Sequence, residues 1–260
     1  MLSDRNKRIL YRNGLFVLGF GLPLALSLYF ILGVQTDWAR MSTFDMVVKN
    51  LEKFLPPNLS VIPDLMDATL DTILIAFLAT LVIAALVPPV VWLSSRNITP
   101  NIVFYYVGRG IIIISRSVHE LVWALIFVIA VGLGPLAGIM ALGIRGIGFV
   151  SKIVSEEVEA IDVRPIEALR ATGASTLNVI ILAVIPQIVP VFLGTLIFQW
   201  EIDLRRAAVI GVVGGGGLGL AFHQAMIQFK WHDAMAIVVI LIVIVAVGEI
   251  VSRMLRKRII

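Results

Sequence analysis

The apolar residues of this chain fall in blocks of about 20, the length that an α-helix needs to cross a hydrocarbon core. Mean hydropathy is +1.00 and only 15% of the 260 residues are charged, whereas a soluble domain carries about 25%. Lipid offers no hydrogen bonds to the backbone, so a chain of such blocks must cross as helices. The sequence therefore predicts an all-α polytopic membrane protein.

Six transmembrane helices account for the apolar blocks. They cover residues 14–33, 69–93, a third helix that follows a loop at 94–110 and rises to 133, then 136–155, 176–199 and 233–251. The first block is long for a signal peptide, and no A-x-A-like cleavage site follows it. Lys and Arg flank the first and last blocks, and such residues mark the cytoplasmic side. Both termini are therefore predicted in the cytoplasm of a multi-pass inner-membrane protein.

The blocks suggest three segments. Residues 1–68 form a cytoplasmic tail, the first span and an extracytoplasmic loop; residues 69–252 form the core; and residues 253–260 form a basic cytoplasmic tail that anchors topology. The basic residues explain the sequence pI near 9.6 by their places beside apolar blocks. Membrane lipid, and not nucleic acid, is the partner that they indicate.

Motifs for catalysis are absent from the sequence. There is no cysteine, none of the three histidines forms an H-x-x-x-H or HExxH pair, and neither GxSxG nor a GxxxxGK[ST] phosphate loop occurs. No catalytic residue, metal site or cofactor is therefore predicted, and the chain is not expected to be an enzyme. The run from Gly214 to Gly219 satisfies GxGxxG formally, but no βαβ unit surrounds it. We interpret it as a flexible or closely packed turn, with an ordinary loop as the alternative.

A short polar segment, Glu167-Ala168-Leu169-Arg170-Ala171-Thr172-Gly173, lies on the predicted cytoplasmic side between the fourth and fifth spans. Pro165 suits the first turn of a helix, and Gly173 suits the left-handed stop after it. Two turns are too short to be stable alone, so the helix needs a partner surface. The alternative is a capped loop helix in which Glu167 and Arg170 form one solvated ion pair.

This segment resembles the EAA loop of ABC importer permeases. The family pattern is E-A-A, three residues, G, nine residues, then I-x-L-P, and Gly173 and Pro186 fall at the expected spacing. A second stretch, Trp200 to Arg206 running into the glycines that end at Gly219, resembles the phosphonate and phosphite permeases. The similarity covers roughly residues 69–252.

The resemblance implies a type I importer fold, in which one N-terminal span precedes a five-helix core with a short cytoplasmic coupling helix. Such permeases work as homodimers with a dimer of ATP-binding subunits and an extracytoplasmic substrate-binding protein. They import their cargo by alternating access, and here the cargo would be phosphonate, phosphite or a related phosphorus oxyanion. The residues expected to couple the permease to the ATPase are Glu167, Ala168, Leu169, Arg170 and Gly173.

Arg145 stands about ten residues after Pro135, so it lies about 15 Å along its span by helical rise. An arginine at mid-membrane costs about 2.5–3.5 kcal/mol on insertion scales and should face the bundle interior or water. One hypothesis is that Arg145 lines the pathway and attracts an oxyanion; the other is a structural ion pair with Glu120. The pathway candidates are Arg145, Glu201, Arg205, Arg206, Gly214, Gly216 and Gly219.

Glu201, Asp203, Arg205 and Arg206 are expected at the outer end of the fifth span, where a salt-bridged turn is the alternative to a receiving site for cargo or binding protein. Two other functions stay open. An ABC permease for an amino acid or another small solute would carry the same EAA segment. An ion-coupled transporter would normally show inverted repeats and intramembrane carboxylates, for which Glu120 and Glu249 are the apparent candidates.

Overall fold

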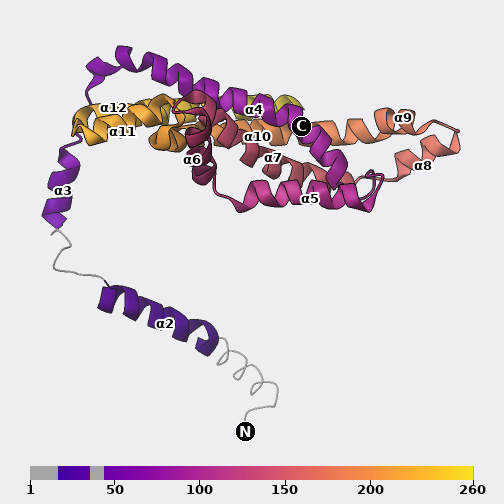
Figure 1. Cartoon of the computed structure of the whole chain (residues 1–260), viewed down its shortest axis with the longest axis horizontal. Coiled ribbons are helices and arrows are strands. Elements are labelled where there is room, and N and C mark those ends of the chain that lie inside the picture. Colours follow the sequence, from indigo (N-terminus) through magenta and orange to yellow (C-terminus); the bar gives the residue numbers. More distant parts are fainter. Residues whose placement is uncertain (1–16, 36–43, 260) are drawn as a thin grey trace, which may run out of the picture. The chain divides into compact units, whose positions relative to one another are not determined.

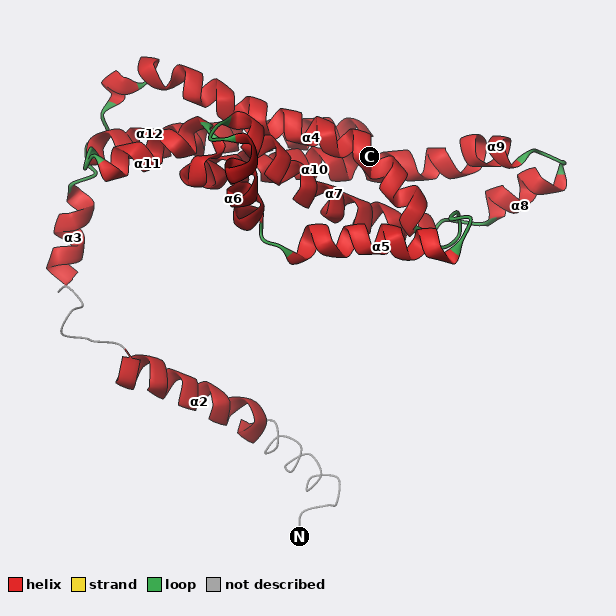
Figure 2. Cartoon of the chain, in the orientation of Figure 1, coloured by secondary structure: helices red, strands yellow, loops and turns green. Residues whose placement is uncertain are grey.

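Every described element of the computed structural model, which covers residues 17–35 and 44–259, is a helix (Figure 1, Figure 2). The predicted all-α fold is thereby confirmed. The chain divides into two compact units, Met1–Lys53 and Phe54–Ile260. The predicted core, residues 69–252, lies within the second unit.

The first unit holds an apolar helix and an amphipathic one. α2 (Leu22–Leu28) is flanked by π-helical turns at Val17–Gly21 and Tyr29–Gln35, and α3 (Phe44–Glu52) follows. The apolar stretch Gly19–Gln35 is shorter than the spanning helices of the second unit. The predicted N-terminal cytoplasmic tail and the start of the first span lie outside the described residues, so that span stays a prediction.

Four helices of the second unit are long and apolar enough to cross a membrane. These spans are Pro63–Ser94, which contains α4 (Met66–Ser94); α7 (Pro135–Glu159); Leu177–Gly215, which contains α10 (Ile185–Ile210); and Trp231–Arg258, which lies in α12 (Trp231–Ile259). A broken pair, α5 (Ile102–Ser117) and α6 (Glu120–Val131), makes a fifth span if it is counted as one. The described residues therefore hold four or five candidate spans, and the predicted total of six is not confirmed.

The predicted third span is wrong in shape, because it breaks in the middle. α5 and α6 meet at an angle of 93°. The break falls at Val118 and His119, which both have extended backbone, and the His119 ring nitrogen accepts a hydrogen bond from the Leu121 amide to cap α6. An unpaired amide in the first turn of a helix requires such a partner. Glu120 consequently opens a new helix deep in the bundle.

The predicted end of the fifth span at residue 199, with an extracytoplasmic loop after it, is also wrong. α10 continues to Ile210, a π-helical turn at Gly211–Gly215 extends it, and α11 (Gly217–Ile227) follows. Glu201 and Asp203 are buried in this helix, at 6% and 0% exposure. Charges at these positions suggested a loop, but each finds a polar partner inside the bundle.

α7 is the centre of the second unit and packs against α4, α5, α6 and α10. Of its most apolar stretch 61% is buried, compared with 22–33% in the other three long spans. A Cβ on Gly138 would lie 2.6 Å from the Gly215 carbonyl oxygen, and one on Gly146 or Gly148 would collide with Ile83 or Ser115. These glycines therefore serve helix packing, since small residues let helix backbones approach closely.

The second unit is elongated, with α8 (Arg164–Ala171) and α9 (Thr176–Val179) at one end and α11 with the start of α12 at the other (Figure 1). We call the first of these the α8 end. At the opposite end the Asn58 side chain donates a 2.7 Å hydrogen bond to Asp233 on α12. The outward faces of the long helices are rich in exposed leucine, isoleucine and phenylalanine. Such a surface fits lipid, and it leaves the bundle interior for the polar residues.

Candidate functional site

Three helices bring charged side chains together inside the bundle. Glu120 of α6 lies between two arginines: its Oε2 atom is 2.6 Å from Arg145 Nε on α7, and its Oε1 atom is 3.3 Å from Arg206 Nε on α10. The ion pair between Arg145 and Glu120, one of the two predicted alternatives, is therefore present. With Asp203 and Gln199 of α10, these residues form what we call the Glu120 cluster.

Local structure explains how each member reaches the cluster. Glu120 is the first residue of α6, where the positive end of the helix dipole favours a carboxylate. Arg145 stands beside Gly146, whose missing side chain leaves room for Ile83 and Gln199. Gln199, Asp203 and Arg206 recur at spacings of four and three residues, so they share one face of α10.

Asp203 is fully buried and accepts a 2.7 Å hydrogen bond from Gln199 Nε2. Its second oxygen has no hydrogen-bond partner among the described residues. Arg206 and Arg145 act on this carboxylate electrostatically. Asp203 was expected at the outer end of the fifth span, and Gln199 was not predicted. The signal was available, since two polar residues four apart in an apolar helix indicate an inward polar face.

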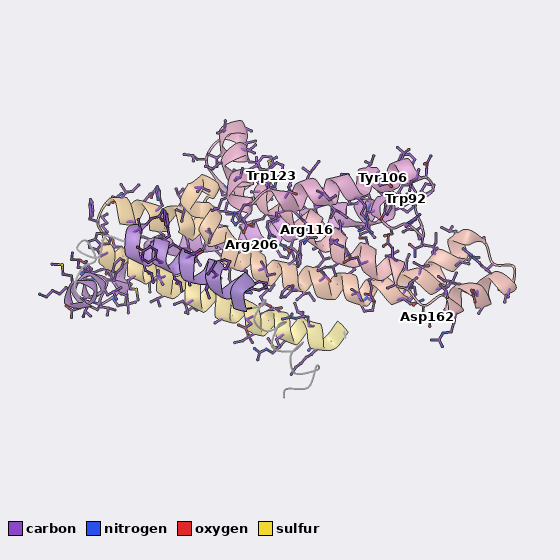
Figure 3. All side chains as sticks on the ribbon, turned by 90° about the horizontal axis from the view of Figure 1, so that it is seen from below. Trp92, Tyr106, Arg116, Trp123, Asp162 and Arg206 are labelled. Atoms are coloured by element: carbon purple, nitrogen blue, oxygen red, sulfur yellow. The ribbon has the colours of Figure 1, made fainter. Side chains whose placement is uncertain are left out.

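The two arginines are the accessible part of the cluster. The side chains of Arg145 and Arg206 are 25% and 22% exposed, whereas the Glu120 side chain is 10% exposed. Each meets Glu120 through Nε, and within the described residues neither makes a hydrogen bond through its terminal nitrogens. Free guanidinium nitrogens in a fork geometry suit the oxygens of a carboxylate or a phosphorus oxyanion. In Figure 3, Arg206 lies near the middle of the second unit.

Glu201 and Arg205 belong to a second polar network. One oxygen of Glu201 is 2.9 Å from Arg205, and the other accepts hydrogen bonds from Ser252 (2.9 Å) and Arg256 (3.0 Å) on α12. The Arg256 guanidinium also lies over the Phe198 ring, 5.8 Å from its centre. This network joins α10 to the last turns of α12. The structure does not bring Glu201 or Arg205 into the Glu120 cluster, and their place in a pathway stays a prediction.

The glycine run forms a closely packed turn in which four helices meet. Gly214 and Gly216 have φ of +100° and +85°, a conformation that favours glycine. The Gly214 carbonyl accepts a 2.9 Å hydrogen bond from the Gly134 amide, and Thr72 of α4 accepts one of 2.8 Å from the Leu218 amide. A Cβ on Gly219 would lie 1.9 Å from the Ala208 oxygen. Of the predicted alternatives, the closely packed turn is confirmed; a pathway role for these glycines stays a prediction.

The polar segment forms α8, as predicted. Pro165 is in the first turn, and Gly173 has φ of +78° and donates its amide to the Arg170 carbonyl at 3.0 Å, which ends the helix. Glu167, Ala168 and Arg170 are exposed, and Leu169 is half-buried. The ion pair of the alternative interpretation is absent, since no hydrogen bond or salt bridge joins Glu167 to Arg170, two residues that the structure describes. The charged face of α8 is therefore uncovered in this chain.

Before α8, Asp162 accepts hydrogen bonds from the Arg164 side chain and backbone, the shortest being 2.6 Å. These hydrogen bonds lower the pKa of the exposed Asp162 carboxyl. An ionised Asp162 thus holds the turn that leads from α7 into α8.

Residues 91–260, more than half of the chain, match the family described as binding-protein-dependent transport system inner membrane component. The chain belongs to this family. It is the membrane-embedded permease subunit of an ABC importer, as its EAA segment predicted, and it is not an enzyme. Membership implies a separate ATPase subunit and a substrate-binding protein.

Named relatives include the phosphate-import permease protein PhnE of Mycolicibacterium smegmatis, which is 36% identical over 80% of this chain and 39% of its own length. The phosphite transport system permease protein PtxC of Stutzerimonas stutzeri is 33% identical over 78% of this chain and 74% of its own. The putative cryptic phosphonate transport system permease protein PhnE2 of Escherichia coli K12 is 39% identical over 45% of this chain and 97% of its own. The match spans well under half of the mycobacterial protein.

Solved structures support the importer fold. A chain of the MetNI methionine ABC transporter in an inward facing conformation superposes with a TM-score of 0.66 at 19% identity, and the match covers 78% of this chain and 99% of that chain. An amino acid ABC transporter crystallised with histidines gives a TM-score of 0.61 at 18% identity and covers 84% and 99%. These similarities confirm the importer fold that the resemblance of the EAA segment implied.

Proposed function

We propose that this permease imports a phosphorus oxyanion, namely phosphonate, phosphite or a close relative such as phosphate. The observation that carries the proposal is the pair of partly exposed guanidinium groups, Arg145 and Arg206, inside an otherwise apolar bundle. Intramembrane charges are costly and are retained at substrate pathways. The names of the relatives with 33–39% identity point to the same chemistry.

In this proposal the pathway passes the Glu120 cluster. Glu120 neutralises part of the positive charge and fixes both guanidinium groups through their Nε atoms, which leaves the terminal nitrogens for cargo. An oxyanion held by two guanidinium groups gains charge-assisted hydrogen bonds. Because Glu120 already pairs with both guanidinium groups, the anion competes with this carboxylate for them and is held weakly enough to leave again.

α8 supports the proposal that a partner ATPase drives transport. Its charged face is uncovered and lies at the α8 end. A two-turn helix presented in this way suits a groove on a soluble partner. In this proposal the ATPase dimer binds α8 through Glu167, Ala168, Leu169, Arg170 and Gly173. Both termini of the permease lie on the same, cytoplasmic side of the membrane. A homodimer of the permease completes the complex.

The test uses the complete complex of permease, ATPase and binding protein in liposomes. Uptake of radiolabelled phosphite is measured alone and in competition with methylphosphonate, phosphate and methionine. We expect at least one phosphorus compound to be imported and methionine not to compete. Import of an amino acid alone would sink the cargo proposal, while the permease assignment would stand.

Arg145→Gln separates cargo binding from packing in the same assay. We expect the uptake rate to fall about tenfold, because the cargo loses one charge-assisted hydrogen bond. The yield of folded protein should stay unchanged. Unchanged uptake with a lower folded yield would make Arg145 a structural ion-pair partner only.

A second candidate cargo is an amino acid. A probable D-methionine permease protein of Pasteurella multocida is 27% identical over 70% of this chain and 91% of its own length. Its identity is lower than that of the phosphorus-compound relatives, and the ammonium group of a zwitterion would be repelled by the two arginines of the cluster. The competition assay decides between the two.

A further inference from the structure

A second group of cations lies between α5 and α7, next to the Glu120 cluster along α7. Arg109, Arg116 and Lys152 line a cavity of about 450 Å³ between α5 and α7, together with Ile112, Ile113 and Ser117. No acidic residue lines this cavity. Its volume is within the usual range for ligand sites, about 300–1,000 Å³. We call it the cationic pocket.

Two of these cations have carboxylate partners and one does not. Arg109 is 2.9 Å from Glu159, and Lys152 is paired with Glu156 one turn along α7. Arg116 is exposed and makes no ion pair with a described residue. The local positive charge that the fold leaves uncompensated is therefore at Arg116. An exposed cation needs no explanation alone, but one in a cavity with two other cations repels them.

Close packing of α5 on α7 positions Arg116 at the cationic pocket. A Cβ on Gly148 would lie 2.6 Å from the Ser115 Cβ and 3.0 Å from the Arg116 Cγ. Gly148 thus lets the end of α5 lie directly on α7, one turn after Arg145. A larger residue at 148 would push Arg116 away from the axis of the bundle.

The cationic pocket continues the line of the Glu120 cluster. Arg145, Gly148 and Lys152 occupy successive turns of α7, and Arg116 of α5 lies against Gly148, so the line advances about 10 Å over seven residues of α7. It runs toward the α8 end, where Arg109 is paired near the end of α7. Figure 3 shows Arg206, Arg116 and then Tyr106 in this order along the unit.

From this placement we infer that the cationic pocket is a second binding station for the phosphorus oxyanion, which it receives from the Glu120 cluster before release at the α8 end. The inference rests on the proposed function. Arg116 supplies the free guanidinium, and Lys152 and Ser117 supply further donors for a tetrahedral anion. Arg109 and Lys152 already have carboxylate partners, so Arg116 is the cation of the pocket that a bound anion would neutralise, and one such charge favours transient occupation.

The same chemistry would suit the phosphate of a lipid headgroup. Trp92 and Tyr106, 48% and 68% exposed, lie nearer the α8 end in Figure 3, and exposed aromatic residues of this kind favour the headgroup level. Arg116 follows Tyr106 by ten residues and is therefore about 15 Å deeper by helical rise. This depth favours a transported anion over an anchored headgroup.

The test compares phosphite uptake by complete complexes containing wild-type permease, Arg116→Gln, Arg116→Lys or the double variant Arg116→Gln/Lys152→Gln. Uptake is measured at saturating binding protein. We expect about a tenfold lower uptake rate for Arg116→Gln, a larger loss for the double variant and partial retention for Arg116→Lys, because lysine keeps the charge but not the fork. Arg253→Gln, which removes an exposed pair with Glu249 on α12, is the matched control and should transport normally.

Each outcome has a definite reading. Wild-type rates in the double variant, with phosphite still imported by the wild type, would overturn the second station and leave the proposed function standing. If the wild type imports no phosphorus compound, both fail. Phosphite-stimulated ATP hydrolysis by the complete complex in dodecyl maltoside, which contains no phosphate, and in phospholipid liposomes separates the two sources of phosphate. A loss in both media supports the transported anion; a loss only in liposomes assigns the pocket to a lipid headgroup and overturns the inference.

Folding is controlled by the yield of monodisperse complex. Should Arg116→Gln fail to fold, Gly148→Ala supplies a second way to displace Arg116 while keeping its charge, and the same loss of uptake is expected. Normal uptake by folded Gly148→Ala, with Arg116 shown displaced, would count against the station.

Discussion

The Glu120 cluster and α8 both contain carboxylates and arginines, but they use them in opposite ways. In the cluster the Glu120 carboxylate pairs with an arginine on each of two other helices, and the carboxylates of Glu120 and Asp203 are nearly or fully buried. On α8, Glu167 and Arg170 are exposed and unbonded to each other, although their spacing would let them pair. The comparison teaches that spacing alone does not make an ion pair. Burial forces partners together, while an exposed pair gains little by closing.

The largest effect is expected from Glu120→Gln. It leaves Arg145 and Arg206 facing each other without their shared carboxylate, and removing one partner of a buried charge network costs about 3–5 kcal/mol. Because both arginines are partly exposed, we expect a loss near the lower figure, about 3 kcal/mol. Thermal unfolding of the detergent-solubilised complex measures it. Glu249→Gln, which breaks an exposed pair with Arg253, should change the midpoint little; equal losses in both variants would contradict the contrast.

Gly173→Ala should have an intermediate effect. The φ of +78° at this residue is strained for alanine, which costs about 1 kcal/mol locally. The strain falls on the end of α8, so global unfolding should hardly change. Hydrogen exchange of the α8 amides should quicken, and ATP hydrolysis should continue with less uptake. If a folded Gly173→Ala complex coupled ATP hydrolysis to uptake as well as the wild type does, the backbone conformation at the end of α8 would not matter for coupling.

The smallest effect on stability is expected in a double-mutant cycle of Glu167→Ala and Arg170→Ala. With no bond between the two side chains, their coupling should be within about 0.3 kcal/mol of zero in the isolated permease. A coupling above about 1 kcal/mol would mean that they pair in solution. In the complete complex, Glu167→Ala should uncouple ATP hydrolysis from uptake. Full transport by this variant would refute its proposed role.

Local signals made α8 predictable. Pro165 and Gly173 act through their own backbone conformations, so the start and the stop of the helix could be inferred without knowledge of the rest of the chain. The long spans were predictable for a similar reason, since the cost of unpaired backbone groups in lipid is independent of neighbours. The pairing of Arg145 with Glu120 was foreseen as an alternative because both were intramembrane charges.

The parts that were mispredicted depend on distant partners. Glu201 and Asp203 suggested the start of a loop because charges in a span are costly, yet Ser252, Arg256 and Gln199 satisfy them. The 93° break at His119 was missed because nothing before Glu120 disfavours a helix; the cap becomes necessary only when the chain turns. Both errors come from contacts between residues that no local pattern relates.

The glycines of α7 also limit how the sequence of this permease can change over time. Gly138, Gly146 and Gly148 each meet a different neighbour: the turn at Gly215, α4 and α5. A methyl group at Gly143 would instead make only an ordinary contact, 3.4 Å from Val82. Substitutions at the first three positions must therefore be matched by a change in one particular partner helix, whereas Gly143 can vary alone. Divergent descendants of this protein should preserve three of these four glycines and lose the fourth.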